Sequence, residues 1–173
     1  RISSGIMIID QHVAHERILY EKAIKFQKTK IPLSQQLLFP INIDLSPVDY
    51  AIVKELYEDL QNLGFEIKLF SETSIVLDGI PADVKLGNEQ NILKEIIYDI
   101  RNNREPNIDA KDYLARTFAC KAAIKFGDHL SQTEMAALID QLFATEMPYV
   151  CPHGRPVIIK ISVDELDKKF GRK

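Results

Sequence analysis

The decisive stretch of this chain is an apolar run that leads directly into a helical pattern, IMIIDQHVAHERILYEKAIKFQK, residues 6–28. Its first four residues are all apolar and predict a buried β-strand. Asp10 follows, and aspartate is a favoured residue at the start of a helix. From there apolar side chains recur on one face, which predicts a helix that ends before Pro32. A strand followed by a long helix indicates an α+β or α/β-like domain.

The rest of the chain mixes strand patterns with helix patterns. Extended segments are expected at 35–45, 65–69, 75–77 and 157–163, and helices at about 47–62, 89–102 and 109–127. Two further helices are expected to open at the capping boxes Ser131–Glu134 and Ser162–Glu165. Gly64 is expected to cap the helix that precedes it. The expected fold class is therefore α+β, with helices on mixed sheets.

Two breaks in the pattern set the expected domain organisation. Segment 47–106 forms a complete small β/α unit between them, and Asn102 to Pro106 is the second break. We therefore expect a discontinuous subdomain made of 1–46 and 107–173, with 47–106 inserted as a smaller subdomain. The first residues run straight into a strand, so we also expect the chain to be a fragment of a longer protein.

Composition excludes several classes of protein. The 173 residues are 46% hydrophobic and 27% charged, an ordinary globular balance. Two cysteines exclude a disulfide scaffold and favour a reducing compartment. No apolar run approaches the roughly 20 residues of a membrane span, and no signal peptide is present. The net charge is -3, whereas a domain that binds DNA by itself is usually basic. If this domain acts on a nucleic acid, another part of the protein or a partner must hold that substrate.

Metal-binding side chains gather in two short runs far apart in the sequence. His12 and Glu16 are four residues apart and share one helix face. Cys151 and His153 are two apart, and on an extended segment they point the same way. These four side chains supply the carboxylate, imidazole and thiolate ligands of a tetrahedral zinc site.

Further polar residues accompany both runs. Asp10 and Glu21 are then available either to bridge this ion to a second one or to bind the second ion themselves. Arg155 follows His153 by two residues, and a guanidinium fork suits phosphate. Metal beside an arginine suggests phosphate chemistry.

A purely structural interpretation stays open for the same residues. In it Asp10 is only a helix cap, Glu16 and Glu21 are solvated helix charges, and Cys151 is a small buried apolar residue. Cys120, alone on a helix, is then a core residue, His15 is exposed, His129 is a cap or surface residue, and 154–156 is a turn into the next strand.

The two runs together resemble the C-terminal domain of the MutL family of mismatch-repair proteins, in its endonuclease-bearing branch. The family has the pattern Asp-Gln-His-Ala, followed after two residues by Glu and after four more by a second Glu. This chain matches it at Asp10, Gln11, His12, Glu16 and Glu21, and Val13 replaces the alanine. The family's Cys-Pro-His-Gly-Arg-Pro motif matches at all six positions of 151–156.

Two shorter motifs extend the resemblance. Ala119-Cys120-Lys121 is similar to the family's Ala-Cys-Arg, although lysine keeps the charge and loses the fork. Phe170-Gly171-Arg172 matches a terminal Phe-x-Arg. The motifs cover the discontinuous outer part of the chain in the family's order.

The resemblance implies a dimerisation subdomain that carries the nuclease site and a smaller external, regulatory subdomain. It implies zinc in the site and manganese for turnover, with magnesium as a substitute, and ATP bound only by an absent N-terminal ATPase. The implied metal ligands are Asp10, His12, Glu16, Cys120, Cys151 and His153. The implied catalytic residues are Asp10, Glu16 and Arg155, and the implied supporting residues are Gln11, Glu21 and Lys121.

The implied partners follow from the family's role. They are a second copy of the chain, double-stranded DNA held weakly by this part alone, and a mismatch-recognition protein that acts through the full-length protein. The implied location is the bacterial cytoplasm, in association with the nucleoid, and no membrane is involved.

A fifth motif points to a further partner. Residues 35–40 resemble the short peptide Gln-x-Leu-Leu-x-Pro by which MutL nucleases bind the replication sliding clamp. The matching residues are Gln35, Leu37, Leu38 and Pro40. An extended peptide of this kind suits recognition by pockets on a partner. The alternative is a plain edge strand.

The expected reaction is metal-assisted hydrolysis of a phosphodiester in one strand of DNA. A metal held by Asp10, His12 and Glu16 would polarise the phosphate and lower the pKa of a bound water, with a second ion on the cysteine side. Arg155 would neutralise charge on the phosphate. The alternatives are a non-catalytic zinc-containing module for dimerisation and clamp binding, with a closed metal site, and an adaptor whose metal motif is vestigial.

Overall fold

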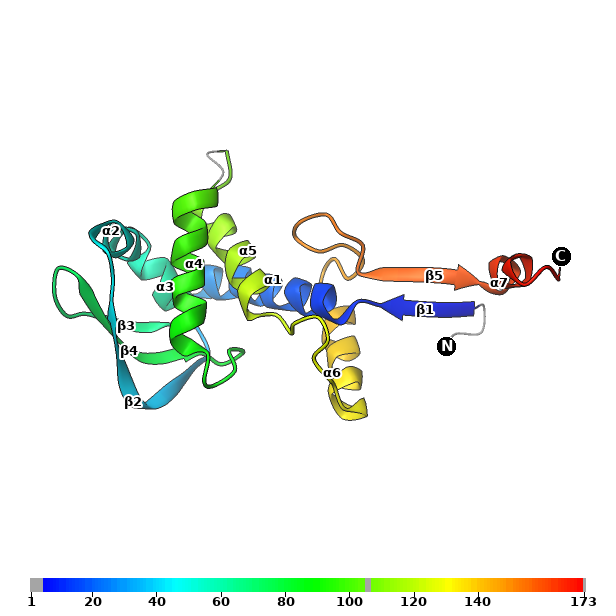
Figure 1. The fold of residues 1–173 in the computed structure, drawn as a ribbon, viewed down its shortest axis with the longest axis horizontal. Coiled ribbons are helices and arrows are strands. Elements are labelled where there is room, and N and C mark those ends of the chain that lie inside the picture. Colours follow the sequence, from blue (N-terminus) through cyan, green and yellow to red (C-terminus); the bar gives the residue numbers. More distant parts are fainter. Residues whose placement is uncertain (1–4, 105–106, 173) are drawn as a thin grey trace. The chain divides into compact units, whose positions relative to one another are not determined.

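The computed structural model describes residues 5–104 and 107–172, and Figure 1 shows their fold. Its helices and strands are β1 (Gly5–Ile9), α1 (Gln11–Thr29), β2 (Ser34–Asp44), α2 (Pro47–Glu55), α3 (Tyr57–Leu63), β3 (Glu66–Leu69), β4 (Ser74–Pro81), α4 (Glu89–Asn103), α5 (Ala110–Ala122), α6 (Gln132–Phe143), β5 (Ile158–Ser162) and α7 (Val163–Lys169). All strand pairs in this part of the chain are antiparallel. The α+β class is confirmed. Residues 1–4, which suggested a longer protein, and 105–106 of the predicted break lie outside the described residues.

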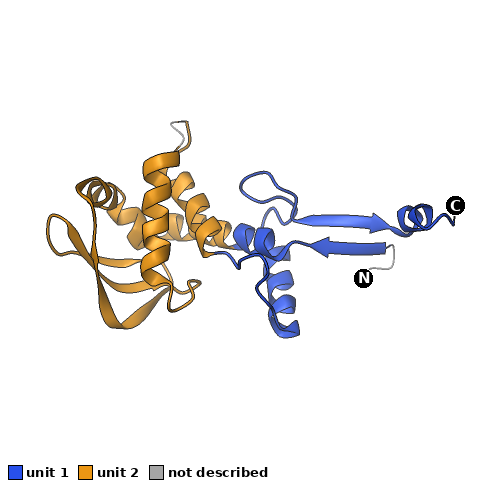
Figure 2. Cartoon of the chain, viewed as in Figure 1, with its two compact units in different colours: residues 1–18, 123–173 blue, residues 19–122 orange. Residues whose placement is uncertain are grey.

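The chain forms two compact units. The first combines Arg1–Ile18 with Ala123–Lys173, and the second is Leu19–Ala122 (Figure 2). A discontinuous unit was expected, but its predicted boundaries were at 46/47 and 106/107. The second unit is larger than the predicted insert because β2 pairs with β4 and α5 packs on α4. Assignment of dimerisation and regulation to parts of the chain stays a prediction.

The second unit is built around a three-stranded sheet with the order β2-β4-β3. Helix α4 contributes one continuous buried face, with Ile92, Leu93, Ile96, Ile97 and Ile100. Such a stripe follows from apolar residues at spacings of three and four. Phe65 and Phe118 meet edge to face, with ring centroids 6.2 Å apart. The second unit therefore has its own hydrophobic core.

Local differences from the predicted elements lie at helix ends. The helix expected over 47–62 is two helices, because the backbone of Leu56 leaves helical values at φ -97° and ψ 15°. Gly64 caps the second of them in the left-handed region at φ 104°, as predicted. The helix expected over 109–127 ends earlier, at Ala122, since side chains of α1 bind the backbone of Ile124.

The first unit contains β1, β5, α6, α7 and the start of α1. Its core residues are Val13, Ala14, Ile18, Leu138, Leu142, Cys151 and Val157. Both predicted capping boxes are present, at Ser131 and Ser162. The prediction that residues 6–9 are buried is wrong: Ile6 is 40% and Ile8 49% exposed. The reason is that β1 pairs only with β5, so this two-stranded ribbon has an uncovered face within the single chain.

In the described part of the chain, no helix is both long enough and apolar enough to cross a bilayer.

Candidate metal centre

Asp10 lies at the junction between β1 and α1 and is committed in part to the backbone. Its Oδ1 accepts the N–H of Val13 at 3.1 Å, and its own carbonyl accepts the N–H of Ala14 at 2.9 Å. Its N–H donates to the carbonyl of Val157 at 3.1 Å. Asp10 is therefore the cap of α1 expected by the structural interpretation, and its exposed carboxylate remains accessible to a ligand.

Glu16 is the buried acid of the site. Only 2% of it is exposed, so the interpretation of a solvated helix charge is wrong for this residue. Its Oε1 lies 2.5 Å from Nδ1 of His153, which forms an ion pair with it when the ring is protonated. A buried carboxylate is costly unless positive charge faces it, so the arrangement favours a cation or a protonated histidine at this position.

Cys151 and His153 lie in a tight turn rather than on the extended segment that was expected. The N–H of Cys151 donates to the carbonyl of Arg155 at 2.9 Å, and Gly154 adopts φ 81°. The Cys151 sulfur in turn accepts the N–H of His153 at 3.3 Å and that of Arg155 at 3.4 Å. Two amide donors aimed at one sulfur offset negative charge on it, as a metal-bound thiolate requires.

These three side chains form one compact cluster. A carboxylate oxygen of Glu16, the Cys151 sulfur and a ring nitrogen of His153 all lie within 4.8 Å of one another. Zinc bonds to such atoms are about 2.0–2.3 Å long, so small shifts of the side chains would let a single ion reach all three. The mixed oxygen, nitrogen and sulfur donors, together with the burial of the Glu16 carboxylate, fit a zinc ion.

The structure places the other predicted ligands outside this three-residue cluster. His12 directs Nδ1 to the carbonyl of Ile124 at 2.8 Å. Cys120 is half-buried near the end of α5 in the second unit, and Lys121 beside it forms an ion pair with Asp99 at 3.8 Å. Their part in metal binding therefore stays a prediction.

The predicted supporting and phosphate-binding residues differ in their surroundings. Gln11 donates from Nε2 to the carbonyl of Asp128 at 2.8 Å, which holds the loop after α5 against the start of α1. Glu21 is half-buried on α1. Arg155 is exposed, and in the described part of the chain its guanidinium has no ion-pair partner. The Arg172 guanidinium stacks on the Phe170 ring at 5.8 Å, beyond α7.

Sequence reasoning missed two polar side chains of α1. Arg17 is only 6% exposed and donates from Nε to the carbonyl of Val150 at 2.6 Å, next to Cys151. His15 was expected to be exposed but is half-buried, and its Nδ1 accepts the N–H of Ile124 at 3.0 Å. The backbone groups that these two side chains bind are more than a hundred residues away in sequence, so no local sequence pattern predicts the bonds.

The segment 35–40 lies on an edge strand, as the structural alternative proposed. β2 is the edge of its sheet, and its pairing with β4 is interrupted between Gln36 and Ile41. In the interruption Leu38 is 94% exposed and Phe39 83%. Gln35 instead donates from Nε2 to the carbonyl of Val84 at 2.6 Å. The exposed bulge is free to meet a partner, whereas the glutamine is engaged within the unit.

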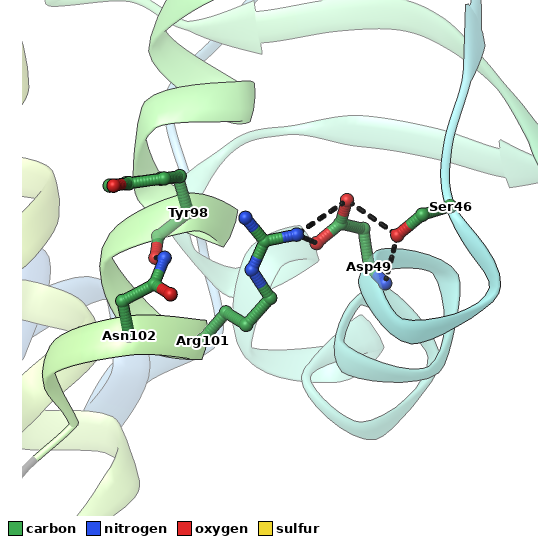
Figure 3. A network of polar contacts seen from close by, with 5 residues as sticks. All are labelled: Ser46, Asp49, Tyr98, Arg101 and Asn102. Atoms are coloured by element: carbon green, nitrogen blue, oxygen red, sulfur yellow. Dashed lines mark hydrogen bonds and ion pairs between the residues drawn. The ribbon is translucent and has the colours of Figure 1, made fainter.

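The second unit also contains an open cavity of about 680 Å³. Its lining consists of Asp44, Leu45, Ser46, Asp49, Asn91, Lys94, Glu95, Ile97, Tyr98, Arg101 and Lys121. Arg101 pairs with Asp49 at 3.0 Å, and the Ser46 hydroxyl donates to the same carboxylate at 2.7 Å (Figure 3). These contacts join the start of α2 to α4, which explains the network as structural.

Comparisons with known proteins complete the description. The family model for the MutL C terminal dimerisation domain matches residues 2–130. A DNA mismatch repair protein MutL from Pelodictyon phaeoclathratiforme is 51% identical over 100% of this chain and 28% of its own length. Those from Chloroherpeton thalassium and Chlorobaculum parvum are 49% and 50% identical over 99% of this chain and 27% and 28% of their own lengths.

The match extends along nearly the whole chain, but the chain spans only about 28% of the first of these relatives. It therefore corresponds to one part of a longer kind of protein. At this identity and coverage, the chain belongs to the MutL family of DNA mismatch repair proteins and carries that family's C-terminal dimerisation domain.

Proposed function

We propose that this domain is a metal-dependent endonuclease that nicks one strand of duplex DNA during mismatch repair. The observation that carries the proposal is the cluster of Glu16, Cys151 and His153, with its buried carboxylate. A set of donors gathered from both ends of the chain favours a site built for an ion rather than an accidental surface group.

The chemistry of the donors suggests how two kinds of ion would be held. The sulfur of Cys151 and the ring of His153, with Cys120 as a further ligand, suit zinc. The oxygen-rich start of α1, with Asp10, Glu16 and the ring of His12, suits manganese or magnesium. A bound ion of this kind polarises a phosphate and lowers the pKa of a bound water.

The chain's own residues supply the remaining functions. The exposed guanidinium of Arg155 can pair with a DNA phosphate beside the turn that holds Cys151 and His153. Arg17 fixes that turn through the carbonyl of Val150. Gln11 fixes the loop on the other side of α1, and we assign Glu21 and Lys121 a supporting role.

The proposed partners supply what this acidic domain lacks. A net charge of -3 gives weak intrinsic affinity for DNA, which limits indiscriminate nicking. A second copy of the chain, the sliding clamp bound at 35–40, and an ATP-binding N-terminal part that communicates with a mismatch-recognition protein would raise the local DNA concentration. We propose that the protein works in the cytoplasm, at the nucleoid.

A second candidate function is a non-catalytic zinc module for dimerisation and clamp binding. The observation that favours it is the commitment of an Asp10 oxygen to the cap of α1, which leaves that residue a structural explanation. In this case the zinc would have only protein ligands and no open position.

The first experiment measures metal content and nicking together. Zinc would be counted by mass spectrometry in the wild-type full-length protein, in the double variant Cys151→Ser, His153→Ala, and in His129→Ala as a matched histidine control. We expect zinc in the wild type and in the control and its loss from the double variant. Absence of zinc and manganese from the wild type, after both are supplied, would contradict the proposal.

Nicking of supercoiled DNA with manganese and the clamp separates the two functions. Asp10→Asn should abolish nicking, about a hundredfold or more, while zinc content and stability remain, because asparagine caps helices as well as aspartate does. If Asp10→Asn nicks as fast as the wild type, the catalytic assignment fails. If the zinc-loaded wild type does not nick at all, the closed zinc module is the better account.

A further inference from the structure

One residue outside every predicted site has both of its backbone polar groups bound by histidines. The carbonyl of Ile124 accepts a hydrogen bond from Nδ1 of His12 at 2.8 Å. The N–H of Ile124 donates to Nδ1 of His15 at 3.0 Å. The two histidines are three residues apart on α1 and therefore share one helix face.

This arrangement fixes opposite tautomers on the two rings. A carbonyl oxygen only accepts hydrogen bonds, so the Nδ1 of His12 must carry the proton in its contact with Ile124. In the neutral ring the lone pair then lies on Nε2, which is a nitrogen that can bind a metal. The Nδ1 of His15 accepts a hydrogen bond, so in this geometry it carries no proton.

Ile124 depends on these side chains because no regular element holds it. Helix α5 ends at Ala122, and Ile124 lies in the loop that follows. The Asp128 carboxylate accepts the N–H of Lys125, in the peptide group that bears the Ile124 carbonyl, and Gln11 donates to the carbonyl of Asp128 further along the loop. His15 binds the N–H of Ile124, in the preceding peptide group, and so holds the other side of the same residue.

We propose that His15 is a positioning residue that holds Ile124 so that the Ile124 carbonyl fixes the tautomer and the ring orientation of His12. A histidine ligand is commonly oriented by a hydrogen bond from its other ring nitrogen to a carbonyl. Here the residue that bears the carbonyl is itself held, through its N–H, by a second histidine one helical turn away. The consequence for metal binding by His12 rests on the proposed function; the effect on the tautomer does not.

Two substitutions test the role of the acceptor. His15→Leu removes it, whereas His15→Asn places an oxygen close to the position of Nδ1 and keeps it. His129→Leu is the matched control, since it makes the same replacement at an exposed histidine. Circular dichroism of each variant would verify the fold.

The first readout is the tautomer of His12. Nitrogen NMR of the ring-labelled 173-residue chain, with His12→Gln for assignment, should show the proton on Nδ1 in the wild type, in His15→Asn and in His129→Leu. In His15→Leu the proton should move in part to Nε2. An unchanged His12 tautomer in a folded His15→Leu protein would overturn the inference.

The second readout is manganese affinity, measured by the electron paramagnetic resonance of free manganese with the same variants. His15→Leu should weaken binding about 10- to 100-fold, as loss of a group that orients a ligand does, and His15→Asn should restore it. If the wild type binds no manganese but His15→Leu still changes the His12 tautomer, the proposed function fails and the positioning role stands. Equal manganese affinity in a manganese-binding wild type and in His15→Leu would contradict the positioning role in metal binding.

Discussion

At the scale of single residues, the sequence reveals those whose role is local. Gly64 and the capping serines Ser131 and Ser162 act on their own helices, and all three do what the sequence predicts. Glu16 and His15 differ, because their burial depends on segments that arrive from the other end of the chain. Their residue types were visible in the sequence, but their surroundings were not.

Gly64 offers a residue-scale prediction because it has both a left-handed backbone and a close neighbour. A Cβ there would lie 2.9 Å from the carbonyl oxygen of Leu33. Gly87 has a similar φ of +91° and nothing within 4 Å of the same position, so it is the matched control. Gly87→Ala should lower the free energy of unfolding by about 1 kcal/mol, from the backbone conformation alone.

Gly64→Ala should cost roughly 1–3 kcal/mol more than the control, because the backbone of a buried turn must move. Denaturation in urea, followed by circular dichroism, measures both values. Equal losses for the two variants would show that the contact with Leu33 relaxes freely.

At the scale of elements, periodicity predicts where helices and strands lie but not where they are interrupted. The alternating and amphipathic patterns placed β2 and α4 correctly. The break at Leu56 carries no glycine or proline signal of its own, and we attribute it to the packing of the core, which is a tertiary effect. The bulge in β2 does contain a signal, because Pro40 has no N–H to donate to the ladder with β4.

The bulge makes an element-scale prediction about the sliding clamp. Leu38→Asp should reduce clamp binding at least tenfold, since it replaces an exposed apolar side chain with a charge at the proposed contact. Val48→Asp is the control, a similar change at a residue that is 58% exposed on α2 of the same unit. Surface plasmon resonance with immobilised clamp measures both. If Leu38→Asp binds as tightly as Val48→Asp, the segment is an edge strand without this partner.

At the scale of the whole molecule, α6 has apolar residues on two sides. Leu138 and Leu142 are buried in the first unit. Met135, Ile139 and Phe143, spaced by four, remain 43%, 39% and 47% exposed. An amphipathic helix needs only one apolar stripe for its own core, so the second stripe suits a second copy of this dimerisation domain.

This stripe predicts the behaviour of the dimer. Ile139→Glu should dissociate it and raise the dimer dissociation constant about a hundredfold or more, since a charge would be buried without a partner. Gln141→Glu adds the same charge to an exposed position of the same helix and should leave the dimer intact. Analytical ultracentrifugation gives both constants. A dimer that tolerates Ile139→Glu would place the interface elsewhere.

The first unit, which draws on both ends of the chain, has a consequence for biosynthesis. A ribosome delivers all of residues 19–122, and so every core residue of the second unit, before it reaches Cys151. Domains commonly fold in this order during translation. Glu16 is made before that core, but its cysteine and histidine partners are made only after it. A ribosome that stalls after residue 122 therefore leaves a chain that contains the complete second core and cannot form the cluster.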